Sequence, residues 1–127
     1  LLARAYQSIA SGYASRENFE KSRATLEDAI GYFEGNVPVV NKLKENMATM
    51  YVKAGEPAKA IDLLVEIGTD TASPDDLDSI YFAATLAERD GDITQAAQLY
   101  QKFLDSQSRS FSLRRQATNR LSEIGFN

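Results

Sequence analysis

Apolar residues recur along this chain at spacings of three and four, which is the period of one face of an α-helix. Two such series follow one another in the second half of the chain: Ile80, Ala83, Ala84 and Ala87, then Ala96, Leu99, Tyr100, Phe103 and Leu104. Gly91 ends the first series, and Asp92 can cap the next helix, with Gln95 completing a capping box. Alternation of apolar and polar residues, typical of strands, never extends beyond a few positions. The pattern therefore predicts two helices joined by a tight turn.

The same pattern recurs at a nearly constant period, with small residues aligned on small ones and bulky residues on bulky ones. The aligned sets are Ala10, Tyr13, Glu17, Ser22, Leu26 and Ala29; Ala48, Tyr51, Gly55, Ala60, Leu64 and Ile67; and Ala84, Ala87, Gly91, Ala96, Tyr100 and Phe103. One further step from Gly91 reaches Gly125, preceded by Thr118 and Leu121. Three full units and a half unit account for the chain, as expected of a helical repeat protein.

Helix-start signals agree with these units. Asn36 and Pro38 precede the first helix of the second unit, and Pro57 opens its second helix. The run Ser73–Asp76 combines a capping hydroxyl, a proline and two acids, which favours a helix start in the third unit.

The half unit is predicted to be a single capping helix. Leu113, Ala117, Leu121 and Ile124 lie on one side of it, and the other side carries Arg114, Arg115, Arg120 and Glu123. A stack of helix pairs leaves an apolar face at its end, and a helix with a polar outer side closes it. The N-terminal end carries no such cap, so further repeats or a partner are expected to cover it.

The spacing resembles the tetratricopeptide repeat, a unit of 34 residues with small and large side chains at fixed places in a helix–turn–helix. The resemblance covers about residues 3–105 and the final helix; it is weakest in the first unit, where Glu17 replaces the turn glycine and Ser22 the packing alanine. It implies an all-α fold: an α-solenoid of three helix pairs plus a C-terminal capping helix, forming one domain over residues 1–127. The expected boundaries are about 3–34, 37–69 and 74–106 for the repeats and about 111–125 for the capping helix.

The segment Tyr100–Leu104, followed by Leu113–Ala117 and Leu121, is also similar to bacterial periplasmic tetratricopeptide proteins that are tethered by an N-terminal membrane helix. This narrower likeness implies a role in envelope protein handling. The expected location is then the periplasm, if an upstream anchor was removed, and otherwise the cytoplasm. Direct membrane contact by this fragment is not expected, because no apolar run approaches the length that spans a bilayer.

The amino-acid composition disfavours several classes of partner, catalysis and metal binding. Fourteen basic and 18 acidic residues give a net charge of −4, which disfavours a nucleic-acid partner. The chain contains no His and no Cys, so the usual general base and the thiolate ligands are missing. Asp90–Asp92 fails as a calcium loop, because Leu86 and Ala97 stand at two required ligand positions. We therefore expect no enzyme activity, cofactor or metal, and we assign the acids at Asp75, Asp76 and Asp78 to helix-start stabilisation.

Charge is unevenly distributed. Residues 55–92 hold two bases and ten acids, a balance of −8, whereas residues 93–127 hold five bases and two acids, a balance of +3. Two readings stay open: solvated helix faces that keep the chain soluble, or a dipolar surface that orients a charged partner or a second copy.

In tetratricopeptide-repeat proteins, which this sequence resembles, the first helix of each pair lines a concave groove. The side chains that project from these helices away from the core are predicted to form a peptide groove: Gln7, Ser11, Lys42, Glu45, Thr49, Tyr81, Thr85 and Glu88. Tyr81 is either an interface anchor or a packing residue, whereas Phe82 is expected to face elsewhere and pack on the final helix. Some members of that family bind the carboxylate tail of heat-shock chaperones through a clamp of basic residues and asparagines. Asn46 is the only residue of this sequence that matches a clamp position.

These expectations favour a protein–protein interaction scaffold that binds a peptide or helix of a partner in the groove. The alternative is a self-association or assembly module, driven by the open N-terminal face.

Overall fold

The computed structural model describes residues 2–71 and 73–125. Over this part of the chain every regular element is helical, which confirms the predicted all-α class. The elements are α1 (Leu2–Ser15), α2 (Phe19–Tyr32), α3 (Val37–Lys53), α4 (Pro57–Thr69), the 3₁₀ helix η1 (Pro74–Leu77), α5 (Asp78–Arg89), α6 (Ile93–Asp105) and α7 (Phe111–Glu123). The chain divides into two compact units, Leu1–Leu63 and Leu64–Asn127, with the boundary inside α4.

Three of the turns between helices have the same backbone geometry, at the positions where the repeats align. Glu17, Gly55 and Gly91 all have positive φ, at 60°, 78° and 87°. The following amide donates in each case to the carbonyl five residues back: Asn18 to Tyr13 at 2.8 Å, Glu56 to Tyr51 at 2.9 Å and Asp92 to Ala87 at 2.9 Å. This is the hydrogen bond of a Schellman-type helix end. The three aligned turn positions therefore share one backbone conformation, including the first, where a glutamate is left-handed.

In the first unit, α1, α2 and α3 pack against one another around a shared apolar core. Leu26, Ala29 and Leu43 are almost fully buried there. Ser22, which replaces the expected alanine, is equally buried, and its hydroxyl donates to the Ala10 carbonyl at 2.8 Å. A hydroxyl is tolerated at this position because it is hydrogen-bonded across the α1–α2 interface.

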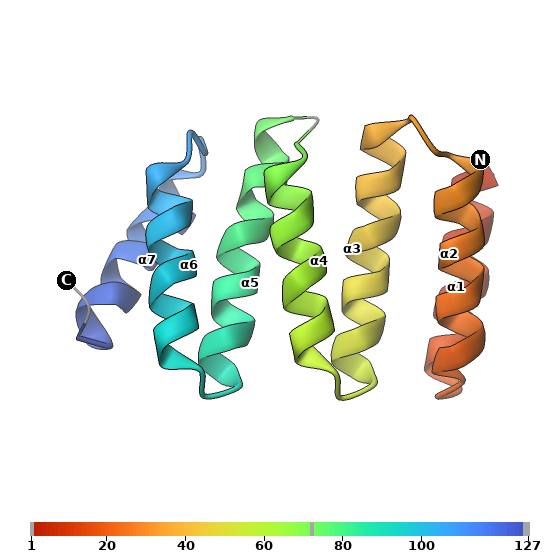
Figure 1. Ribbon diagram of the computed structural model, residues 1–127, viewed down its shortest axis with the longest axis horizontal. Helices are drawn as coiled ribbons and strands as arrows, with labels where there is room; N and C mark the ends of the chain where they lie inside the picture. The colour runs from red at the N-terminus through yellow and green to blue at the C-terminus, as the bar shows by residue number, and fades with distance from the viewer. Residues whose placement is uncertain (1, 72, 126–127) are drawn as a thin grey trace. The chain divides into compact units, whose positions relative to one another are not determined.

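In the second unit, α5 and α6 lie side by side and α7 packs against α6 (Figure 1). The centre of this core is aromatic, with Tyr81, Tyr100 and Phe103 all buried. From α7, Ala117 and Leu121 are buried, as predicted for its inner side, whereas Thr118 is exposed.

The start of the third predicted repeat differs from the expectation. Residues Pro74–Leu77 form a 3₁₀ helix, and the α-helix begins only at Asp78. The Asp78 carboxylate accepts hydrogen bonds from the Ser108 and Ser110 hydroxyls, both at 2.7 Å, and so ties the α6–α7 connection to the start of α5. The predicted caps are confirmed elsewhere: Asn36 accepts from the Val39 amide at 3.4 Å.

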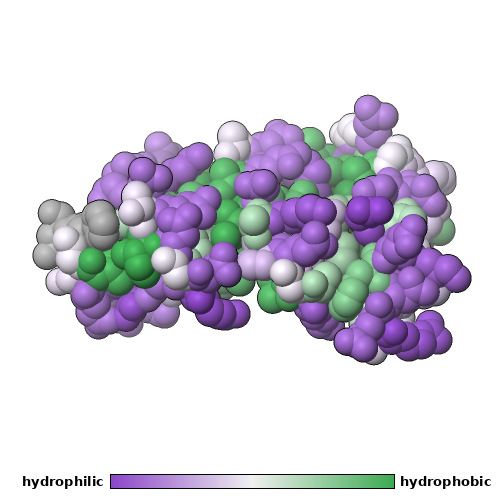
Figure 2. All heavy atoms as spheres, turned by 60° about the horizontal axis from the view of Figure 1, so that its bottom comes forward, coloured by the Kyte–Doolittle hydropathy of each residue, from purple (hydrophilic) through white to green (hydrophobic). Residues whose placement is uncertain are grey.

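Hydrophilic residues (purple) cover most of the face drawn in Figure 2, and hydrophobic residues (green) show between them. Among the described residues, no helix is both long and apolar enough to cross a membrane.

Candidate functional site

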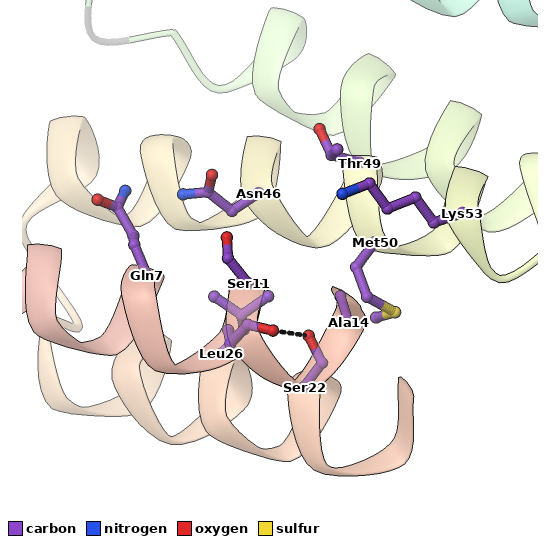
Figure 3. A pocket seen from close by; sticks show the side chains of 10 residues that line it. Gln7, Ser11, Ala14, Ser22, Leu26, Asn46, Thr49, Met50 and Lys53 are labelled. Carbon is purple, nitrogen blue, oxygen red and sulfur yellow. Dashed lines mark hydrogen bonds between the residues drawn. The ribbon is translucent and has the colours of Figure 1, made fainter. Parts of the chain in front are cut away.

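The predicted groove residues fall into two sets, one in each unit. In the first unit, Gln7 and Ser11 on α1 and Thr49 on α3 line one hollow, together with Asn46 and Lys53 of α3 (Figure 3). The floor of this hollow consists of buried side chains from all three helices, among them Ala10, Ala14, Leu26 and Met50. The structure therefore brings together three of the five residues that the repeat register predicted for this unit.

The rim of this hollow is polar, and Lys53 is the charged residue that lines it. In Figure 3 the Gln7 and Asn46 carboxamides extend from facing helices on the same side of the hollow. The Asn46 amide donates to the Lys42 carbonyl at 3.1 Å, and its oxygen remains an acceptor. Carboxamides that both donate and accept suit the N–H and C=O groups of an extended peptide.

Lys42 and Glu45, predicted for the same groove, do not line this hollow. They form an exposed ion pair with each other, at 3.6 Å and three residues apart on α3. An exposed pair of this kind contributes little to stability. They therefore lie outside this hollow, to which α3 contributes Asn46, Thr49 and Lys53, and their assignment to a peptide groove stays a prediction.

In the second unit, Tyr81, Thr85 and Glu88 of α5 line another hollow, with Arg89, Tyr100 and Arg120. Glu88 is the centre of its polar network. Its carboxylate forms an ion pair with Arg120 and accepts a hydrogen bond from the Tyr100 hydroxyl at 2.8 Å. The hydrogen bond from Arg120 is the main reason why the pKa of Glu88 is lowered, against the opposing effect of partial burial. Glu88 is therefore an ionised carboxylate whose charge is already balanced within the unit.

Tyr81 is a packing residue rather than an exposed anchor. Only 7% of it is exposed, and its ring lies 5.8 Å from that of Tyr100 and 5.6 Å from that of Phe103. Its hydroxyl donates to the Gln116 side-chain oxygen on α7 at 2.9 Å. Burial is the main cause that raises the pKa of Tyr81. The neighbouring Phe82 is 49% exposed, and its ring lies 5.5 Å from that of Tyr81. Its expected packing on the final helix stays a prediction.

Two arginines predicted for the solvent-facing side of the capping helix instead bond to its neighbours. Arg120 pairs with Glu88, and Arg114 donates to the Ser106 and Leu104 carbonyls at 3.0 and 2.8 Å. A helical wheel cannot place them, because a long guanidinium side chain bends back from the edge of a helix. The partners are also far away in sequence: 32 residues separate Glu88 from Arg120.

The acids that the sequence assigned to a helix start have structural partners. Asp76 accepts from the Ser73 amide at 3.3 Å, and Asp78 binds the two serines of the α6–α7 connection. Within residues 2–71 and 73–125, no three His, Cys, Asp or Glu side chains come close enough to hold a metal ion.

By its fold, the chain belongs to the class of all-α proteins, and the hollows described above have polar side chains at their rims and buried residues beneath them. Comparison with family models, with curated proteins and with solved structures found no match.

Proposed function

We propose that this chain is a tetratricopeptide-repeat scaffold that binds an extended segment of a protein partner along the first helices of its helix pairs. The proposal includes the α-solenoid arrangement of three pairs and a capping helix. Its support is the repeated turn geometry at Glu17, Gly55 and Gly91, each of which joins two consecutive helices.

One observation carries the binding role. Gln7, Ser11 and Thr49, predicted as groove residues from the family resemblance, line a single hollow with a buried, largely apolar floor and a rim of hydrogen-bonding groups. An apolar floor can take a partner side chain, while carboxamides and hydroxyls at the rim can bond to its backbone. Such a hollow suits a peptide segment, which needs both kinds of contact.

A selection from a random-peptide display library tests this role. Peptides enriched on the wild-type chain should bind at least tenfold more weakly to Ser11→Arg, because the long side chain would fill the exposed rim of the hollow. Ser8→Arg is the matched control: it adds the same charge at an exposed position of α1 that does not line the hollow. Failure to enrich any peptide, or equal loss in both variants, would refute binding at this hollow.

A second candidate is the assembly module. Leu2 and Ile9 on α1 are 46% and 51% exposed, although both are apolar, and burying them against a second copy would be favourable. Light scattering after size exclusion should then show a dimer that Ile9→Glu disrupts, whereas a strict monomer at high concentration would exclude this role.

A further inference from the structure

Helix α7 is held in the second unit by less apolar burial than its neighbours. Two of its 13 residues, Ala117 and Leu121, are buried apolar residues, compared with five of twelve in α5 and five of 13 in α6. Apolar burial is the main favourable term in packing, so α7 gains less from it than α5 or α6 does. A helix with few buried apolar residues belongs to the part of a structure that opens most readily.

Leu113 is half-buried as well, and polar side chains supply further attachments. The most central of them is the cluster of Glu88, Tyr100 and Arg120, here called the Glu88 latch, which joins α5, α6 and α7. Gln116 adds a bond from the Tyr81 hydroxyl, and Arg114 reaches carbonyls at the end of α6. The Arg120 side chain is 37% exposed and that of Glu88 is 20% exposed, so solvent and salt reach the latch.

The latch is also part of the hollow of the second unit. Five of the residues that line this hollow come from α5 and α6, and Arg120 is the one contributed by α7. If α7 moved away, the Glu88 carboxylate and the Tyr100 hydroxyl would lose their cationic neighbour and face solvent. The buried Tyr81 ring would also lose its bond to Gln116.

We propose that α7 is a strap that detaches from α5 and α6 while these two helices stay folded. The Glu88 latch sets how often α7 detaches. Opening uncovers Glu88 and Tyr100 and widens the hollow of the second unit. The strap thereby controls access to this hollow, whatever its ligand.

Amide hydrogen exchange on the full 127-residue chain tests the strap. In the wild-type chain, α7 amides should exchange at least tenfold faster than the buried amides of α5 and α6. Arg120→Gln should accelerate exchange in α7 by a further factor of about two to five and leave α5 and α6 unchanged, because a partly exposed charged pair is worth about that factor. Arg115→Gln is the matched control, since it removes the same charge from an exposed position of the same helix.

The salt dependence of hydrogen exchange in the same variants is an independent test. Raising NaCl from about 0.05 M to about 1 M shortens the screening length several-fold and should weaken the latch. Exchange in α7 should then accelerate in the wild-type and Arg115→Gln chains, but much less in Arg120→Gln, which has no latch to screen. The proposal is overturned if α7 exchanges at one common rate with α5 and α6, if the two variants behave alike, or if salt affects all three chains equally.

Discussion

Tyr81 and Phe82 are adjacent aromatic residues with opposite environments, and their replacement tests the description of the second unit directly. Tyr81 is 7% exposed and packs against two further aromatic rings, whereas Phe82 is 49% exposed. Truncating a buried aromatic side chain to alanine costs about 3–5 kcal/mol, which includes the cavity left behind. We therefore expect Tyr81→Ala to lower the free energy of unfolding by about 4 kcal/mol.

Two control substitutions separate the contribution of the Tyr81 hydroxyl and the effect of a half-exposed ring from this loss of unfolding free energy. Tyr81→Phe keeps the ring and removes the hydroxyl that donates to Gln116, so it should cost about 1 kcal/mol, the net value of one hydrogen bond. Phe82→Ala removes a ring that is only half covered and should also cost about 1 kcal/mol, roughly half of the transfer free energy of a fully buried Phe.

Urea denaturation followed by circular dichroism measures all three variants, with hydrogen exchange in α5 and α6 locating the effect in the second unit. The expected order of destabilisation is Tyr81→Ala well above Tyr81→Phe and Phe82→Ala. A larger loss in Phe82→Ala than in Tyr81→Ala would refute the assigned environments. Full stability of Tyr81→Ala, combined with weakened peptide binding, would restore Tyr81 as an exposed anchor.

Two glycine positions and one glutamate give further predictions. Gly68→Ala should destabilise the chain by about 1–2 kcal/mol, because the new methyl group would clash with the buried Ile80 side chain. When the same change is made in an Ile80→Ala background, it should cause no further destabilisation. Gly31→Ala, where nothing lies within 4 Å of the added methyl group, should instead stabilise by up to about 1 kcal/mol, and thermal unfolding distinguishes the two signs. Glu17→Gly should stabilise by about 0.5–1 kcal/mol in chemical denaturation, since glycine adopts the 60° φ at this turn without strain; a loss of stability would refute the strain.

The helices and turns could be predicted from the sequence because their causes are local. The apolar period, caps such as Asn36 and turn residues such as Gly91 act within a few positions, and the structure confirms the cap and the turn. The replacement of the turn glycine by Glu17 was also visible, and the structure adds that the backbone conformation is kept in spite of it.

The site could be predicted only in part, because its details depend on partners that are distant in sequence. The face of α1 that carries Gln7 and Ser11 follows from the repeat register. The Tyr81 hydroxyl donates to Gln116, and the hydrogen bond from Arg120 lowers the pKa of Glu88; both of these partners are contributed by α7. No local pattern links these residues, so a polar position on a helical wheel looks equally free whether or not a distant side chain pairs with it.

Under the proposed function, stability and partner binding are separable in the first unit and combined in the second. Ser11 and Lys53 stand exposed at the rim of the first hollow, so their replacement should change binding with little effect on folding. Glu88 and Arg120 line the second hollow and at the same time hold α7 in place. A loss of binding after their replacement would have two explanations, local contact or release of the strap. The first unit is consequently where a partner's contacts can be mapped by mutation alone, and the second requires exchange measurements beside every binding measurement.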